Sequence, residues 1–352
     1  MPRTRRFLAA GIAALSLVSL AACSRAENTD AAAANTATDK GPAEELRLGY
    51  FPNVTHAGAL IGLEQGFFAK ELGGTKLTPT KFNDGPTEVS AFLGGSLDAG
   101  FIGSGPAINA FAKSNGEAVR LVSGATSGGA QLVVAEGINT PQDLKGKTVV
   151  TPQLGNTQDV ALKKWLSDNG LKDQVTVTNR ENAQTLDAFK KGELQAAWLP
   201  EPWSSRLVLE GGAKVLLDEK TLWPDGKFPT TTLIVRTQYL KEHPATIEAL
   251  LRGLGQANAF AQSNTAEAKK AVNTQLEKLT GKPLAAATID RAFTSISLDT
   301  DPLAATYPQL AEDQVTAGIA QSAVKLDGFF DLTALNKVNK AAGKPEFSAD
   351  GK

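Results

Sequence analysis

The chain has 352 residues, of which 42% are hydrophobic and 21% charged, and its net charge at neutral pH is −1. This composition is typical of a soluble globular protein with room for about two domains. Because positive and negative charges balance, no global field favours binding to nucleic acid or to an acidic membrane surface. We therefore expect no nucleic-acid partner.

The first 22 residues have the pattern of an export signal. A basic start precedes residues 7–22, an apolar stretch too short to span a bilayer comfortably. Residues 20–23 resemble the processing box of bacterial lipoproteins, which implies cleavage before Cys23 and lipid attachment to it. Cys23 is the only cysteine in the chain and can form no intramolecular disulfide. The alternative is a plain signal peptide with an incidental cysteine. Residues 4–8 approach a twin-arginine signal without its usual spacing.

Residues 23–44 contain almost nothing to bury and are predicted to be a disordered tether. With a lipid at Cys23, this tether would hold an exported domain at the cell membrane, either in a periplasm or on the outer face of the cytoplasmic membrane. Residues 346–352 are predicted to be a loose tail.

From Leu46 onward, short apolar strands alternate with amphipathic helices, which predicts an α/β fold. Strands are expected at 46–50, 76–82, 99–102, 119–123, 130–135, 147–150, 175–177, 196–199, 215–217 and 231–235. A polar, glycine-rich loop is expected at 126–129. Beyond Thr237 the pattern becomes mostly helical, as in residues 247–257, whose apolar positions recur at helical spacing.

Two parts of the chain repeat the same layout. Residues 92–102 align with 189–199, and residues 55–60 align with 157–162, in the same order and about 100 residues apart. We therefore expect two similar α/β lobes with a ligand cleft between them. Lobe 1 is expected at residues 45–135 and 230–345, and lobe 2 at 136–229. The chain would cross between them near 130–135 and 231–236.

The stretch Leu46–Leu60 passes directly from a strand into a helix, which leaves unpaired N–H groups aimed beyond the strand end. Similar loops follow three other predicted strands, at Ser104 and at residues 156–159 and 201–203, and none of these four loops contains Lys or Arg. An anion would therefore be held by N–H groups, hydroxyls, amides and helix dipoles. The candidate ligand-binding residues are Asn53, Thr55, His56, Ser104, Ser127, Gly128, Asn156, Thr157, Gln158, Asp159, Glu201 and Trp203.

Two of these residues are carboxylates, and each has two interpretations. Asp159 lies three residues after Asn156, the spacing of a helix-capping pair. Glu201 has the position of a first-turn acid that the helix dipole favours. Alternatively, one of them faces an ammonium group, and the ligand is then a zwitterion with an oxyanion and an amine.

Catalysis and metal binding have little support. The chain has two histidines, His56 and His243, and no further ligand lies at metal-binding spacing from His56. An enzyme with His56 as its base is a rival hypothesis, but the sequence offers no partner to orient that histidine. Cofactor-binding motifs are incomplete, so we expect no cofactor and no metal.

The motifs GYFPNVTHA, GSGPA, SGGAQLVV, TPQLGNTQDVAL, AWLPEPWSSRLVLEGG and LWPDGKFPTT resemble the solute-binding lipoproteins of ABC importers in the aliphatic sulfonate, taurine and nitrate group. The resemblance implies a type II periplasmic-binding-protein-like fold that closes on its ligand. It also implies delivery to an ABC permease driven by a separate ATPase, by a monomeric protein. The expected ligand is taurine or an alkanesulfonate, with Phe51 and Trp203 as apolar walls. Nitrate and a thiamine-pyrimidine-type precursor are the alternatives.

Overall fold

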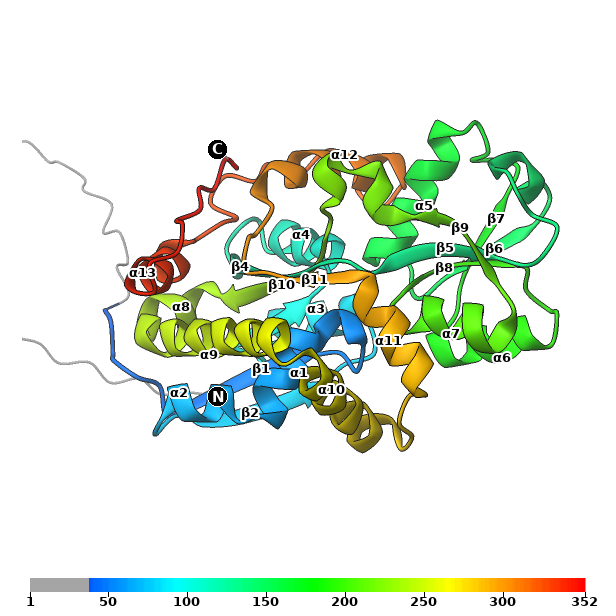
Figure 1. Ribbon diagram of the computed structural model, residues 1–352. Helices are drawn as coiled ribbons and strands as arrows, with labels where there is room; N and C mark the ends of the chain where they lie inside the picture. Colours follow the sequence, from blue (N-terminus) through cyan, green and yellow to red (C-terminus); the bar gives the residue numbers. More distant parts are fainter. Residues whose placement is uncertain (1–37, 352) are drawn as a thin grey trace, which may run out of the picture. The chain divides into compact units, whose positions relative to one another are not determined.

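The computed structural model describes residues 38–351 (Figure 1). The predicted signal peptide, Cys23 and most of the predicted tether lie outside the described residues. The rest of the chain confirms the α/β prediction with two sheets, which we call sheet A and sheet B. Lobe 1 is from here on the part built on sheet A, and lobe 2 the part built on sheet B.

Sheet A has six strands in the order β11-β4-β10-β3-β1-β2. Strands β2 and β3 run parallel to β1, and β10 runs antiparallel to both β3 and β4. The strand predicted at residues 231–235 is therefore confirmed as β10, in the interior of the sheet. The strands of sheet A are β1 (Glu45–Tyr50), β2 (Lys76–Lys81), β3 (Ala99–Ile102), β4 (Val119–Gly128), β10 (Pro229–Arg236) and β11 (Ile296–Leu298).

Sheet B has five strands in the order β7-β6-β8-β5-β9. Strands β7 and β8 run parallel to β6, and β5 runs antiparallel to β8 and β9. This repeats the arrangement of β2, β1, β3, β10 and β4, so the two lobes share one layout, as the internal repeat predicted. The strands of sheet B are β5 (Ala130–Val134), β6 (Thr148–Thr151), β7 (Thr176–Asn179), β8 (Ala196–Pro200) and β9 (Lys214–Asp218).

In each sheet, one strand directly follows, along the chain, a segment of the other lobe. Strand β5 follows β4 directly yet pairs in sheet B, although residues 130–135 were expected in lobe 1. Strand β10 follows the last segment of lobe 2 and pairs in sheet A. The first crossing is therefore Gly129, whose φ of +79° suits glycine.

The prediction of a glycine-rich loop at residues 126–129 is wrong for most of this stretch. Strand β4 continues to Gly128, because Thr126 and Ser127 pair with β10 on one side and with β11 on the other. The three-residue strand β11 was not predicted, since it is too short to show an alternating pattern.

Helices cover both faces of the sheets. In lobe 1 they are α1 (Ala57–Glu64), α2 (Phe67–Leu72), α3 (Gly85–Leu93) and α4 (Ser104–Lys113), and in lobe 2 α5 (Thr157–Asp168), α6 (Asn182–Lys190) and α7 (Trp203–Gly211). Short 3-10 turns lie at Val54–His56, Pro141–Leu144, Glu219–Leu222, Pro224–Gly226 and Ala304–Thr306. The helical C-terminal part comprises α8 (Thr237–Glu242), α9 (Pro244–Ser263), α10 (Thr265–Thr280), α11 (Ala286–Thr294), α12 (Tyr307–Thr316) and α13 (Thr333–Ala341).

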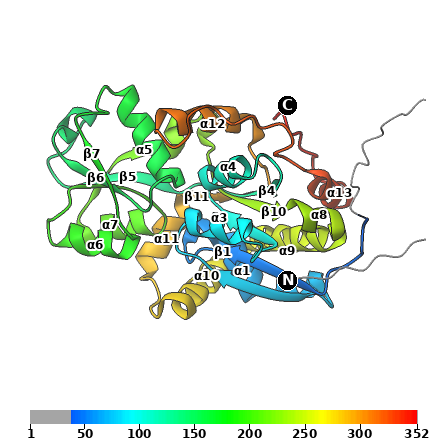
Figure 2. The ribbon, with the colours of Figure 1, turned by 180° about the vertical axis from the view of Figure 1, so that it is seen from behind.

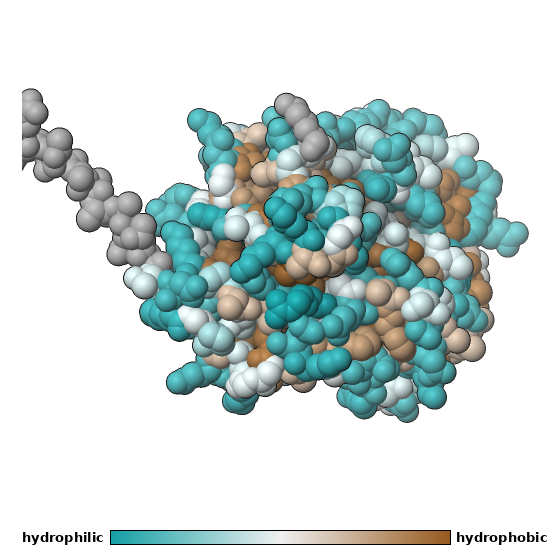
Figure 3. All heavy atoms as spheres, turned by 60° about the vertical axis from the view of Figure 1, so that its left-hand side comes forward, coloured by the Kyte–Doolittle hydropathy of each residue, from teal (hydrophilic) through white to brown (hydrophobic). Residues whose placement is uncertain are grey.

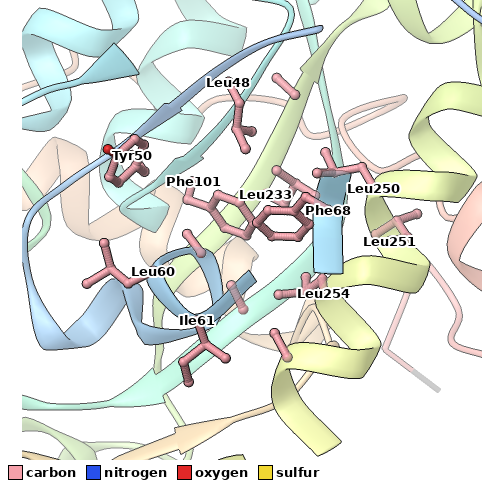
Figure 4. Close-up of a cluster of buried hydrophobic side chains, with 14 of the residues drawn as sticks. Leu48, Tyr50, Leu60, Ile61, Phe68, Phe101, Leu233, Leu250, Leu251 and Leu254 are labelled. Carbon is pink, nitrogen blue, oxygen red and sulfur yellow. The ribbon is translucent and has the colours of Figure 1, made fainter. Parts of the chain in front are cut away.

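Alternating strand residues point to opposite faces of sheet A and pack into two hydrophobic cores in lobe 1. Phe101 and Leu233 pack with α1, α2 and α9, as Figure 4 shows. The neighbouring residues Ile102 and Ile234 pack on the other face with α3 and α4. Figures 1 and 2 show these two groups of helices on opposite sides of sheet A. Burial on both faces holds the strand ends of lobe 1 in fixed positions.

Few large hydrophobic side chains are exposed among the described residues. The exposed large hydrophobic side chains of residues 38–351 are Leu93, Leu154, Leu209, Val215 and Leu222. Figure 3 shows one face on which hydrophilic side chains predominate. Within the described part, no helix is both long and apolar enough to cross a bilayer.

Candidate functional site

A small cavity of about 40 Å³ lies between the lobes, with room for roughly three water molecules. The cavity is therefore narrow in this conformation. It is lined by Phe51, Asn53, Thr55, His56, Asn83, Asp84, Gly85, Gly103, Pro106, Pro152, Asn156, Thr157, Gln158, Asn182, Pro200, Thr230 and Thr231.

Helix starts surround this cavity from both lobes. Lobe 1 contributes the turn that precedes α1 and the starts of α3 and α4, and lobe 2 contributes the starts of α5 and α6. The first N–H groups of a helix have no partner within the helix, and the dipole makes this end positive. At α4 and α5, whose N-cap residues carry no carboxylate, the wall is thus suited to an anionic group without a basic side chain.

His56 is a neutral hydrogen-bond donor at this site. Its Nδ1 accepts a hydrogen bond from the Phe51 N–H at 3.3 Å, and the two rings lie 4.4 Å apart. The proton of the neutral ring is therefore on Nε2. Burial lowers the pKa of His56 to about 3, so the ring carries no charge at neutral pH.

Two hydroxyl groups at the lobe boundary are buried and unused by the fold. Within the described part of the chain, Ser104 Oγ and Thr157 Oγ1 have no hydrogen-bond partner. Ser104 begins α4 in lobe 1, and Thr157 begins α5 in lobe 2. The Thr157 hydroxyl lies over Gly103, where a β-carbon would collide with it. Because unpaired buried hydroxyls cost free energy, these two groups favour a ligand acceptor.

The carboxylate of Asp159 forms its hydrogen bonds within lobe 2. Its N–H donates to Asn156 Oδ1 at 2.9 Å, as capping requires. Its carboxylate accepts hydrogen bonds from Gly155 N–H, Thr151 Oγ1 and Lys163 Nζ, at 2.9, 3.0 and 2.7 Å. The side chain is fully buried and its residue does not line the cavity. The capping interpretation therefore describes this residue, and Asn156 and Gln158 face the cavity in its place.

The carboxylate of Glu201 also accepts hydrogen bonds from the protein, one of them from lobe 1. Its Oε1 accepts from Arg291 Nη1 at 3.1 Å, and its Oε2 accepts from the Ser205 N–H at 3.2 Å. Burial raises the pKa of Glu201, and the Ser205 and Arg291 donors oppose that rise. The carboxylate thus faces a cation that the protein itself supplies.

Trp203 joins the lobes at the edge of the cavity. Its Nε1–H donates to Asn53 Oδ1 at 3.1 Å, and Arg206 lies 5.0 Å from its ring. The indole lines a neighbouring hollow with Pro52 and does not line the cavity. Of the two expected apolar walls, Phe51 lies in the cavity wall and Trp203 beside it.

Ser127 and Gly128 lie on strand β4 rather than in the cavity. Ser127 Oγ accepts a hydrogen bond from the Phe228 N–H at 3.1 Å, and the Gly128 carbonyl accepts one from Thr230 Oγ1. Both residues line a separate pocket on β11 and the segment before β10. The structure therefore brings together Asn53, Thr55, His56, Asn156, Thr157 and Gln158, with Ser104 beside them, and leaves Ser127 and Gly128 elsewhere.

Sequence reasoning missed several residues of the site. Asp84 and Asn182 line the cavity, and both stand where a strand passes into a helix, the same signal that pointed to Asn53 and Asn156. Arg291 had no such signal, since it lies in the C-terminal helical part, 90 residues from Glu201. In residues 38–351, no group of three His, Cys, Asp or Glu side chains is placed to hold a metal ion.

The model of the NMT1-like family matches residues 39–276. The chain belongs to this family. The taurine-binding periplasmic protein of Escherichia coli is 29% identical over 189 residues, which are 53% of this chain and 57% of that protein. The family and the fold confirm the resemblance to solute-binding proteins of ABC importers.

Two solved structures show how far the fold is shared. The alkanesulfonate-binding protein of Xanthomonas axonopodis pv. citri, bound to MOPS, is 22% identical and has a TM-score of 0.67, covering 80% of this chain and 95% of that one. The periplasmic nitrate-binding protein of Synechocystis is 16% identical, with a TM-score of 0.73 and coverage of 88% and 94%. At these identities the likeness concerns the fold, which confirms the two-lobed periplasmic-binding-protein prediction.

Proposed function

We propose that this protein is the extracytoplasmic substrate-binding protein of an ABC importer and that it captures a small organosulfonate. The observation that carries the proposal is the cavity between the lobes, whose donors are helix-start N–H groups, hydroxyls, amides and a neutral imidazole. A sulfonate spreads one charge over three oxygen atoms and can accept from several such donors at once. The taurine-binding relative supports this ligand class.

The proposal is for binding without turnover. His56 is the only histidine that lines the cavity, and with a pKa of about 3 it is a weak base at neutral pH. Its Nδ1 accepts a backbone N–H, so no carboxylate orients the ring for proton transfer. Delivery would go to a membrane permease, with the protein held nearby by a lipid at Cys23.

Nitrate is the second candidate ligand, since the small volume of the cavity suits a small planar anion. Calorimetric titration of the mature protein with taurine, ethanesulfonate, nitrate, sulfate and a hydroxymethylpyrimidine separates these ligands. We expect a sulfonate to bind with a micromolar Kd. Sulfonate binding should weaken only modestly from 50 to 500 mM salt, because none of the described residues that line the cavity is Lys or Arg. No sulfonate binding below about 1 mM would contradict the proposal.

A further inference from the structure

The described residues of the cavity wall carry formal charge of one sign only, which is negative. Among the described residues that line the cavity, Asp84 is the only one with a formal charge at neutral pH, since His56 is neutral. A simple anion would therefore meet donors on one part of the wall and an unneutralised carboxylate on another. Charges of the same sign repel each other, and more strongly at a partly buried site than in bulk water. A ligand with its own positive group removes this conflict.

Asp84 keeps acceptor capacity in the folded protein. It caps α3, with Oδ1 accepting from the Thr87 N–H at 2.8 Å and Oδ2 accepting from Thr87 Oγ1 at 3.0 Å. Each carboxylate oxygen can accept two hydrogen bonds, so both retain a free lone-pair direction. Asp84 thus differs from Asp159 and Glu201, whose carboxylates accept from Lys163 and Arg291.

Asn182 provides a second acceptor from the other lobe. It is the first residue of α6, as Gly85 is of α3, and it lines the same cavity. Its Oδ1 is buried and has no hydrogen-bond partner among the described residues. An amide oxygen in this state favours a donor, as Ser104 and Thr157 favour an acceptor. The cavity therefore presents unused groups of both kinds.

We propose that Asp84 and Asn182 are the specificity-determining residues that accept an ammonium group, so that the ligand is an aminoalkanesulfonate rather than a plain alkanesulfonate or an inorganic anion. The inference rests on the proposed function and specifies its ligand. The sulfonate binds at the helix starts of α4 and α5, near His56. The ammonium group binds where α3 of lobe 1 and α6 of lobe 2 begin, so that closing the lobes brings its two acceptors together.

The test compares taurine with ethanesulfonate, which lacks the amine, by calorimetric titration of the full mature protein. We expect the wild type to prefer taurine by at least tenfold. Asp84→Asn retains a good capping side chain and should reduce this ratio at least fivefold. Asn182→Asp adds a carboxylate at the first turn of α6, where it suits the helix dipole, and should raise the ratio.

Asp143→Asn is the matched control, because Asp143 also caps a helical turn with its carboxylate but does not line the cavity. Its ratio should equal that of the wild type. Equal binding of taurine and ethanesulfonate by the wild type, or the same ratio in Asp84→Asn and Asp143→Asn, would overturn the inference and leave the proposed function standing. If neither sulfonate binds, the proposed function and the inference both fail.

Discussion

Arg291 spans the two lobes and donates to Glu201 Oε1 at 3.1 Å. The same guanidinium donates to Ser205 Oγ at 2.7 Å and to Gln131 Oε1 at 2.8 Å. Its helix α11 is anchored in the core of lobe 1 through Ile289 and Ala292. Arg291 therefore ties lobe 1 to β5 and to the start of α7 in lobe 2, and it lies outside the residues that line the cavity.

Removing this cation should leave a buried carboxylate without its partner. We expect Arg291→Met to lower the free energy of unfolding by about 3 kcal/mol, and Glu201→Gln in the same chain to restore most of that loss. Arg252→Met is the control, because Arg252 pairs with Glu71 at the surface and should cost under about 1 kcal/mol. Urea denaturation measures the free energy of unfolding of each variant. Equal losses for Arg291→Met and Arg252→Met would contradict the pairing of Arg291 with a buried carboxylate.

The indole of Trp203 makes a second contact between the lobes, with Asn53 Oδ1. We expect Trp203→Phe and Asn53→Ala each to lower the free energy of unfolding. Together they should lower it by about 1 kcal/mol less than the sum of the single losses, because one hydrogen bond is lost in both. A double-mutant cycle by urea denaturation measures this coupling. Strict additivity would mean that the bond contributes nothing.

Glu219 should make the stability of lobe 2 depend on pH. It is fully buried, with Oε2 accepting from Trp198 Nε1 at 2.9 Å, and burial raises its pKa to about 8. Between pH 4.5 and 8 the folded protein keeps a proton that the unfolded chain releases. The contribution of Glu219 to the free energy of unfolding should therefore fall as pH rises through this window, by roughly 2–4 kcal/mol.

Glu219→Gln mimics the protonated acid and should remove this part of the pH dependence. The difference between wild type and variant, measured by urea denaturation at pH 5, 6, 7 and 8, isolates the group from others that titrate. Glu193→Gln is the control on the exposed surface of the same lobe and should leave the slope as it is. A Glu219→Gln curve parallel to that of the wild type would refute the assignment.

Local rules predicted much of the fold and part of the candidate site. Asn156 and Thr157 follow a strand and begin a helix, so their place at the cleft was readable from the sequence. The repeat of residues 92–102 at 189–199 indicated two similar lobes. Asp84 and Asn182 obey the same strand-to-helix rule and were within its reach.

The rest depends on contacts between distant segments. Glu201 has a first-turn position that a pattern can show, but its partner Arg291 comes from a helix of lobe 1 that no local signal relates to the cleft. Ser127 and Gly128 looked like a loop because glycine usually interrupts a strand. Pairing with β10 and β11, which come from residues beyond 228, extends β4 through them.

The unpaired hydroxyls of Ser104 and Thr157 provide the most direct test of sulfonate binding in this cleft. A ligand that uses Thr157 Oγ1 should bind more weakly to Thr157→Val. The ligand-free protein should lose little stability, because this hydroxyl has no hydrogen-bond partner among the described residues. Thr151→Val is the matched control, since the Thr151 hydroxyl donates to Asp159 Oδ1 at 3.0 Å and supports the fold. It should lower stability.

The deciding measurement is therefore the calorimetric Kd for taurine of the wild type, Ser104→Ala and Thr157→Val, with the free energy of unfolding of each protein measured without ligand. We expect each substitution to weaken taurine binding by about tenfold, close to 1.4 kcal/mol, with unfolding free energies at or above that of the wild type. Unchanged taurine binding in both variants would contradict a sulfonate held by the hydroxyls of this cleft.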